Sequence, residues 1–226
     1  MNEPRPGRAH VLVRVWLPDR PGALGLVASR IGAMRGDIIG VDVLERGLDV
    51  AVDEFAVELP DLDLLSLLVK EVEEVDGASV EEVRIVAAFP DPRLDALESA
   101  ADLCEAADVS ALRIRLVDSS RREFLADWGA LLVAGEVVES VGDVEPGVEL
   151  LGALAVGAAA SPMVAEGETG PDDLALATVP GQDAILFLGR TGRPFRRRER
   201  AQLLAITRIA ARAWKLLPAG VPSPPR

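Results

Sequence analysis

The chain has 226 residues, of which 49% are hydrophobic, so it can form one or two globular domains with sizeable cores. Its single cysteine excludes a framework of disulfide bonds within the chain and a zinc site built from several cysteines. The net charge of −13 at pH 7 argues against general nucleic-acid binding by the whole chain.

The charge is unevenly distributed along the chain. Residues 1–90 carry a net charge of −8 and residues 91–183 a net charge of −14. Residues 184–226 hold 10 basic residues and 1 acidic residue, a net charge of +9. The first ten residues have no apolar core of signal-peptide length, and the longest apolar run, 150–160, is about half of what a membrane span requires. We therefore expect a cytoplasmic protein that does not bind membranes.

The first predicted strand, residues 10–17, leads into a predicted helix, residues 22–35, through a turn rich in proline and glycine. Apolar residues alternate in the strand and then recur at helical spacing. A helix that begins at such a turn offers unpaired N–H groups and a partial positive charge, and both suit a carboxylate. The residues of the turn are Asp19, Arg20, Pro21, Gly22, Ala23 and Leu24.

This turn is the candidate ligand site. We expect the N–H groups of Gly22, Ala23 and Leu24 to hold the carboxylate of a free amino acid. Asp19 or Asp37 would accept the ammonium group of the same molecule. Arg20 would either pair with an acidic side chain or only cover the turn. The alternative is an ordinary strand-to-helix turn that has this shape and no ligand.

The remainder of the first ninety residues predicts a small α+β domain. Gly36 is the expected C-cap of the first helix, and strands are expected at 37–46 and 50–59. A second amphipathic helix begins at Pro60-Asp61 and ends at Gly77, and a last strand follows at 79–88. Two strand–helix–strand crossovers of this size predict a four-stranded antiparallel sheet with both helices on one face.

Residues 89–92 read as a linker, and a second domain follows. Helices are expected at 93–107, 110–125, 149–159 and 197–217, strands at 128–134, 136–141, 174–179 and 184–189, and a loop at 161–173. The last residues, 218–226, contain four prolines and predict a disordered tail. The domains are therefore expected at 9–88 and 93–217.

Several short motifs of the first half occur in the order and spacing of a known family. They are Asp19-Arg20-Pro21-Gly22-Ala23-Leu24, Gly36-Asp37-Ile38-Ile39, Phe55 with Val57, and Asp76-Gly77-Ala78-Ser79-Val80. With them, residues 9–88 resemble an ACT domain, a regulatory module that binds amino acids in metabolic enzymes. The resemblance implies a ferredoxin-like βαββαβ fold, pairing of domains, and a ligand at the shared interface. By this resemblance the ligand-binding residues are those of the turn, together with Gly36, Asp37 and Ile38 at the start of the second strand. Many ACT domains have Asn where this chain has Asp37.

The second half resembles a GAF domain. The resemblance rests on the flanking helices, the central strands and the segment 184–199, where a strand leads through Pro194-Phe195 to a long closing helix. It implies an α/β domain with an antiparallel sheet and flanking helices, which holds a small ligand or forms dimers. The chain has no recognisable cyclic-nucleotide motif or chromophore cysteine in this half.

The residues that could carry catalysis have structural interpretations. His10, the only histidine, begins a strand and has no second histidine or cysteine partner, so we expect no metal site. Cys104 lies among alanines and leucines of a helix and is expected to be a small core residue. No pattern of nucleophile and base is apparent, so we expect neither catalytic residues nor a cofactor.

The basic final helix has two interpretations. Its arginines Arg200, Arg208 and Arg212 are expected on one face, away from an apolar face that contains Leu203 and Ile206. The helix could dock nucleic acid or another acidic partner, or it could pair with the acidic middle segment of its own chain or of a second copy. The large negative charge of residues 91–183 favours pairing within the protein.

Together these observations predict a non-catalytic, bacterial sensor protein that binds an amino acid at the first domain and forms a homodimer. Binding of the amino acid would change the packing of the second domain, and a protein partner would recognise that change. Two alternatives stay open: a ligand-free interaction scaffold, and a transcription-linked regulator that touches DNA through the final helix. The latter lacks a helix-turn-helix motif, so nucleic-acid binding is not expected.

Overall fold

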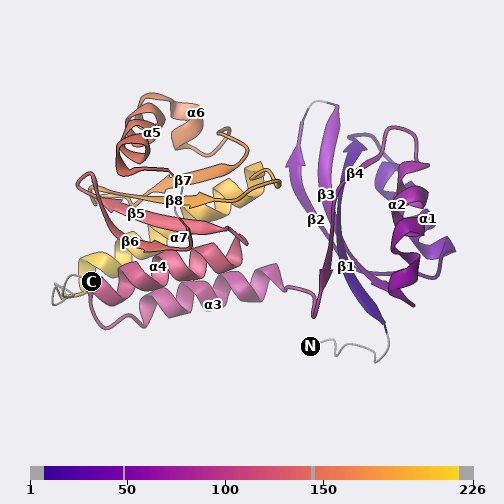
Figure 1. Ribbon diagram of the computed structural model, residues 1–226, viewed down its shortest axis with the longest axis horizontal. Coiled ribbons are helices and arrows are strands. Elements are labelled where there is room, and N and C mark those ends of the chain that lie inside the picture. Colours follow the sequence, from indigo (N-terminus) through magenta and orange to yellow (C-terminus); the bar gives the residue numbers. More distant parts are fainter. Residues whose placement is uncertain (1–7, 48, 144–145, 219–226) are drawn as a thin grey trace. The chain divides into compact units, whose positions relative to one another are not determined.

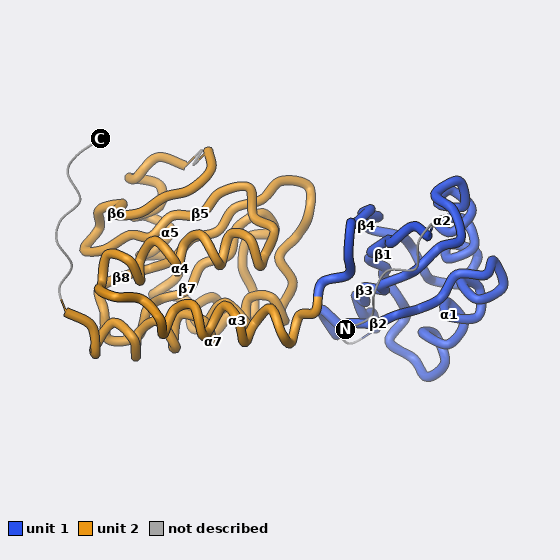
Figure 2. Tube along the Cα trace, turned by 90° about the horizontal axis from the view of Figure 1, so that it is seen from below, with its two compact units in different colours: residues 1–90 blue, residues 91–226 orange. Residues whose placement is uncertain are grey.

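A computed structural model describes residues 8–47, 49–143 and 146–218. The chain divides into two compact units, residues 1–90 and 91–226, coloured blue and orange in Figure 2. The expected disordered tail, 218–226, lies outside the described residues except for Pro218. Among the helices of the described ranges, none combines the length and the hydropathy needed to cross a membrane.

The first unit alternates strands and helices. Its elements are β1 (Ala9–Pro18), α1 (Ala23–Ala33), β2 (Asp37–Arg46), β3 (Val50–Leu59), the 3-10 turn η1 (Leu62–Leu64), α2 (Leu65–Glu73) and β4 (Ser79–Val86). The four strands form an antiparallel sheet in the order β2-β3-β1-β4. Both helices lie on one face of the sheet (Figure 1). The predicted ferredoxin-like βαββαβ fold is thereby confirmed.

The core of the first unit lies between the sheet and its two helices. The inward residues of β1, among them Val11 and Val13, alternate with residues of the opposite face and are fully buried. They pack in one cluster with Ile31 of α1, Phe55 of β3 and Leu68 of α2. The period-two pattern of β1 therefore decides which face of the sheet the helices cover.

The C-terminus of α1 differs from the expectation in one residue. Arg35, not Gly36, adopts the left-handed conformation, with φ = 65°. The N–H groups of Arg35 and Gly36 donate to the carbonyls of Gly32 and Ile31, each at 3.0 Å, which closes the helix in a Schellman motif. Gly36 is needed for a different reason, because a Cβ at this position would lie 2.8 Å from Cγ2 of Ile31.

The second unit is also built on a four-stranded sheet. Its elements are α3 (Pro92–Cys104), α4 (Val109–Glu123), β5 (Trp128–Val133), β6 (Glu136–Val141), α5 (Val148–Ala160), α6 (Pro162–Ala165), β7 (Leu174–Thr178), β8 (Ala184–Gly189) and α7 (Arg197–Leu216). The strands are antiparallel in the order β6-β5-β8-β7. The expectation of an antiparallel sheet with flanking helices is confirmed.

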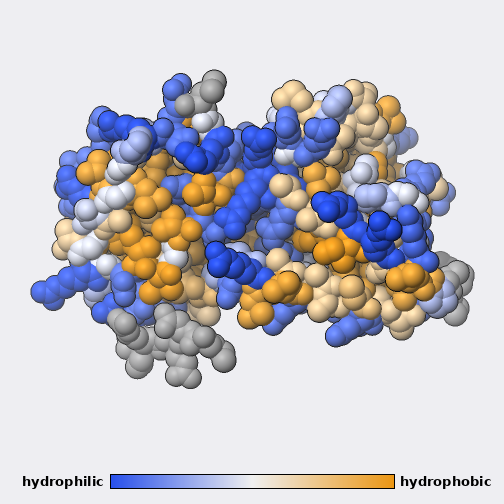
Figure 3. All heavy atoms as spheres, turned by 180° about the vertical axis from the view of Figure 1, so that it is seen from behind, coloured by the Kyte–Doolittle hydropathy of each residue, from blue (hydrophilic) through white to orange (hydrophobic). Residues whose placement is uncertain are grey.

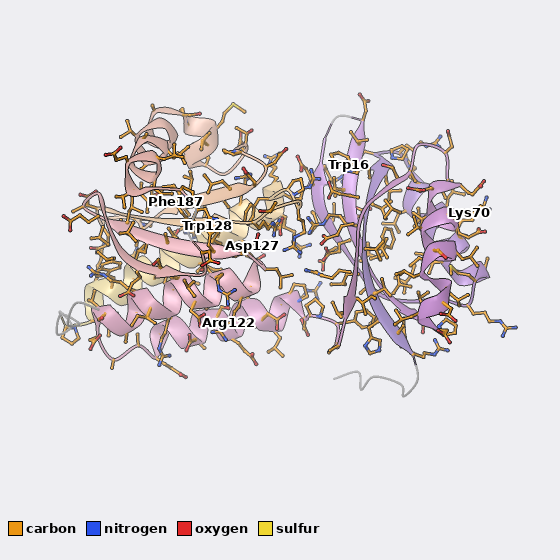
Figure 4. The ribbon with its side chains drawn as sticks, viewed as in Figure 1. Trp16, Lys70, Arg122, Asp127, Trp128 and Phe187 are labelled. Carbon is orange, nitrogen blue, oxygen red and sulfur yellow. The ribbon has the colours of Figure 1, made fainter. Side chains whose placement is uncertain are left out.

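Helices cover both faces of this sheet (Figure 1). Helices α3, α4 and α7 form the larger core on one face, where Leu112 and Leu203 pack with Leu186 of β8. On the other face Trp128 and Phe187, labelled in Figure 4, pack with Leu151 of α5. Both faces of β5 and β8 are consequently buried, which explains their nearly continuous apolar sequence.

Two local expectations in this unit are wrong. The predicted loop 161–173 contains the short helix α6, because Pro162 suits a first helical position and the carbonyl of Ser161 accepts bonds from the N–H groups of Val164 and Ala165. Cys104, expected in the core, is a free and exposed thiol. The neighbouring Leu103 takes the buried position instead, with no exposed surface.

Candidate functional site

Three segments of the first unit meet at one edge of its sheet. Strands β1 and β2 run in the same direction, so both end at the edge where the antiparallel β3 begins. A cavity of about 170 Å³ lies there, between the turn after β1, the end of β2 and the start of β3. It is lined by Leu17, Pro18, Asp19, Arg20, Ala23, Leu24, Val43, Arg46, Ala51 and Asp53. The cavity therefore contains four residues of the predicted site: Asp19, Arg20, Ala23 and Leu24.

An ion pair closes one side of this cavity. Arg46 donates from Nη2 to Oδ1 of Asp19 at 2.7 Å and from Nε to Oδ2 at 3.3 Å. The hydrogen bond that Arg46 donates to Asp19 is the main cause that raises the pKa of Arg46. The backbone N–H of Asp19 also donates to the carbonyl of Asp49 at 2.9 Å. Asp19 thus connects the turn to the end of β2 and to the residue that precedes β3.

The backbone of the turn leaves part of the helix terminus open. Gly22 is the N-cap of α1 and has φ = 91°, a conformation that favours glycine. The N–H of Ala23 donates to the carbonyl of Arg20 at 3.3 Å, so it is engaged in the turn. Within the described chain, the N–H groups of Gly22 and Leu24 donate to no other group. Two of the three predicted N–H donors are therefore open, and Leu24 is the one whose residue lines the cavity.

Gly22 is explained by the conformation of the backbone at this turn. A Cβ at Gly22 would have no heavy atom within 4 Å, and neither Gly22 nor Pro21 lines the cavity. Glycine is required there for its positive φ and not for a close approach of a ligand to the backbone.

A second carboxylate, that of Asp53 in β3, lies at the cavity on the helix-covered face of the sheet. It stands in register with Val15 of β1 and Val43 of β2. Only 4% of Asp53 is exposed, and its Oδ1 accepts no hydrogen bond from the described part of the chain. Burial raises the pKa of its carboxyl, Arg46 partly opposes this, and Asp19 adds to it.

The residues predicted at the start of β2 lie at the other edge of the sheet. Asp37 pairs with Glu58, near the end of β3, whereas Arg46 pairs with Ala51, near its beginning. Their partners Glu58 and Ala51 are seven residues apart on β3, which at about 3.3 Å per residue places Asp37 roughly 23 Å from Arg46. Gly36, Asp37 and Ile38 therefore cannot contact a small molecule at the Asp19 turn of the same chain. Asp37 could therefore take the place of Asp19 only at the turn of a second copy of the chain.

Arg46 and Asp53 were missed by the sequence analysis. Asp53 carried a signal, because the inward positions of β3 continue as Ala51, Asp53, Phe55 and Val57 and only one of them is charged. An acidic residue in the buried register of an amphipathic strand is unusual and indicates a function or a partner. Arg46 carried none, since an arginine at a strand end is ordinary.

In the second unit, the basic segment before α7 is largely internal. Arg190 donates to the carbonyls of Phe124, Arg193 and Pro194 and to both carboxylate oxygens of Glu199, at 2.7–2.9 Å. Its guanidinium also lies 3.9 Å above the centroid of the Phe195 ring. All five N–H donors of this arginine are thereby satisfied.

Arg200 does not lie on the outer face of α7 with Arg208 and Arg212. It is buried, and it donates to the carbonyls of Leu174 and Pro171. Arg208, Arg212 and Lys215 are exposed and form no ion pair with a described residue. A groove of about 720 Å³ lies beside them, with Cys104 of α3 on another side. The basic surface of this helix is therefore confined to its second half and to Arg197 and Arg198 at its start.

The described residues contain no cluster of three or more His, Cys, Asp or Glu side chains that could hold a metal ion. Comparison with protein-family models and with curated proteins found no match. Among solved structures, the chain is similar to the ACT domain of GTP pyrophosphokinase from Chlorobium tepidum, determined by solution NMR. The identity is 13% and the TM-score 0.30, and the match covers 38% of this chain and 93% of the ACT domain.

Proposed function

We propose that the chain is a cytoplasmic, non-catalytic regulatory protein whose first unit, an ACT-type domain, binds a free amino acid at the Asp19–Leu24 turn. The observation that carries this proposal is the cavity of about 170 Å³ at that turn. A helix terminus with an open N–H, an ion pair and a buried carboxylate all contribute to it. An oppositely charged pair of binding groups is what a zwitterion requires.

The size and chemistry of the cavity both favour an amino acid over a larger metabolite. Pockets for drug-sized ligands measure about 300–1,000 Å³. The cavity is smaller, and its remaining walls include the short apolar side chains of Ala23, Val43 and Ala51. The ligand carboxylate would lie at the N–H of Leu24, where the positive end of α1 favours an anion.

The test is a binding screen of the full chain against the twenty amino acids, by thermal shift and then by titration calorimetry. We expect saturable binding of at least one small amino acid, and at least tenfold weaker binding to the Asp19→Asn variant. Glu73→Gln, an exposed charge change on α2, serves as the matched control and should bind as the wild type does. The absence of binding by every amino acid at millimolar concentration would reject the proposal and favour the ligand-free scaffold.

The DNA-binding alternative depends on the basic final helix. Arg190, Arg193 and Arg200 are occupied by carbonyl and carboxylate partners inside the second unit, so they would not be available for phosphates. The basic surface available to DNA is thereby reduced to the exposed cations Arg197, Arg198, Arg208, Arg212 and Lys215.

For the second unit we propose a GAF-like domain that pairs with a second copy of the chain. Four residues of α3 at spacings of three, four and three form an exposed apolar row, here called the α3 stripe: Leu94, Leu97, Ala101 and Cys104. Leu97 is 68% exposed. Such spacing is typical of one helix packed against another. Hydrophobic side chains also reach the surface between charged ones on the face of this unit drawn in Figure 3.

Charge complementarity supports a second copy as the occupant of the α3 stripe. Glu98 and Glu105, exposed on α3, form no ion pair with a described residue. The neighbouring outer face of α7 carries the three equally unpaired cations Arg208, Arg212 and Lys215. A two-fold axis would bring the acidic edge of one copy to the basic edge of the other, twice, as an isologous interface requires.

A further inference from the structure

We propose that the carboxylate of Asp53 accepts the ammonium group of the ligand, so that the cavity selects small molecules that carry a primary ammonium. This inference rests on the proposed function, because it takes the cavity at the turn to be a ligand site. It assigns to β3 a role that the sequence analysis gave to Asp19 or Asp37.

The first argument is the state of Asp53 itself. Its side chain is among the cavity-lining groups, only 4% of the residue is exposed, and its Oδ1 accepts no hydrogen bond from the described chain. A buried carboxylate oxygen without a hydrogen-bond donor destabilises the folded protein, and a ligand that supplies the donor would remove that cost.

The second argument is the charge balance of the cavity. Arg46 is committed to Asp19, with one bond to each carboxylate oxygen. Arg20 is paired with Asp76 at 3.4 Å. Each arginine that lines the cavity therefore has another aspartate as its hydrogen-bonded partner, and Arg46 acts on Asp53 through charge without a hydrogen bond. A ligand ammonium would supply the hydrogen-bond donor that neither arginine gives to Asp53.

The third argument is the position of Asp53 relative to the helix terminus. The open N–H of Leu24 belongs to α1, while Asp53 belongs to the sheet beneath it. A ligand in the cavity would thus meet an anion-binding group from one layer and a cation-binding group from the other. Leu17, Val43 and Ala51 lie among the remaining lining groups. They are apolar and offer an ammonium no acceptor, so the carboxylate of Asp53 would take that part.

The experiment follows the Asp53 carboxyl directly. The full chain is labelled with aspartate carrying 13C in the side-chain carboxyl, and the Asp53 signal is assigned by its loss in Asp53→Asn. Its pKa is measured alone and with methylammonium, acetate or glycine, at constant ionic strength. We expect methylammonium and glycine to lower this pKa by about one unit or more, because a nearby cation favours the ionised form. Acetate should not lower it.

Amino-acid affinities of two variants complete the test. Asp53→Asn should bind the amino acid found in the screen at least tenfold more weakly. Glu54→Gln changes the next residue of β3, whose side chain pairs with Arg14 on the other face of the sheet, and should retain the wild-type affinity.

The outcomes separate this inference from the proposed function. If Asp53 responds neither to methylammonium nor to glycine, or if Asp53→Asn binds the amino acid as tightly as the wild type, the inference is wrong. If Asp53→Asn binds the amino acid as tightly as the wild type does, the proposed amino-acid function still stands. If methylammonium shifts Asp53 while no amino acid binds, Asp53 is an ammonium acceptor and the proposed amino-acid function is rejected.

Discussion

Arg46, the last residue of β2, holds both carboxylate oxygens of Asp19, the first residue after β1, at 2.7 and 3.3 Å. The two residues are 27 positions apart in the chain and come together because the parallel ends of β1 and β2 flank the start of β3. The side chain of Arg46 is 68% exposed and that of Asp19 22%. This contact fixes the turn against the sheet at the mouth of the cavity.

The Arg46→Gln variant tests that role. Because the pair is exposed on the arginine side, its loss should change the free energy of unfolding only slightly. It should nevertheless weaken amino-acid binding by about tenfold, since the turn loses its attachment to β2. Denaturant unfolding and calorimetry measure the two effects. Arg30→Gln removes a similar exposed pair, with Glu71, away from the cavity and should leave affinity unchanged.

The raised pKa of Asp53 predicts a dependence of stability on pH. The folded state holds this proton more tightly than the unfolded state does, so the stabilising contribution of the protonated carboxyl is complete below its unfolded pKa of about 3.9. It is lost as the pH rises through the higher pKa of the folded state. The free energy of unfolding of the wild type and of Asp53→Asn is measured across this pH range. The decline caused by Asp53 should be present in the wild type and absent from the variant. Identical pH profiles for the two proteins would contradict the assignment.

The place of Asp37 at the far edge of the sheet gives a separate prediction. Asp37→Asn should bind the amino acid within twofold of the wild-type affinity, because roughly 23 Å of sheet separates it from Arg46. Titration calorimetry on the full chain measures this. A large loss of affinity would instead place Asp37 of a second copy in the site, as the resemblance to ACT domains implies.

Arg190 and Glu199 should be the most sensitive charged pair of the second unit. The side chain of Arg190 is 2% exposed and that of Glu199 14%. Removing one partner leaves the other charge buried, so Glu199→Gln should destabilise this unit by about 3–5 kcal/mol. Hydrogen exchange of β5 and β8 reports on this unit separately. Glu168→Gln, which breaks the exposed pair with Arg197, is the control and should cost less than about 1 kcal/mol.

Pairing through the α3 stripe predicts a change of mass in solution. Leu97→Glu should convert dimers to monomers in size-exclusion chromatography with light scattering, because it places a charge in the middle of an apolar contact. Arg93→Glu, an exposed change on the same helix outside the stripe, should retain the dimer. A wild-type chain that is monomeric at micromolar concentration would contradict the proposed pairing.

The fold of the first unit and the order of its strands and helices follow from local patterns of the sequence. Alternating apolar residues in β1 and helical spacing in α1 and α2 leave one arrangement in which every apolar face is buried. The sequence also located the turn at Asp19–Leu24, because proline and glycine mark local backbone geometry. Local signals of this kind depend only on neighbouring residues.

Which distant residues share the site depends on the tertiary structure. The fold places Asp37 far from the turn and Arg46 and Asp53 beside it. Strand direction and register, and not distance along the chain, bring these side chains together. The same holds for Arg200, which helical periodicity assigned to the outer face of α7 and which lies buried against the carbonyls of Pro171 and Leu174. A long side chain at the boundary of a helix face turns toward whatever acceptors the neighbouring segments offer, and those are fixed only when the chain has folded.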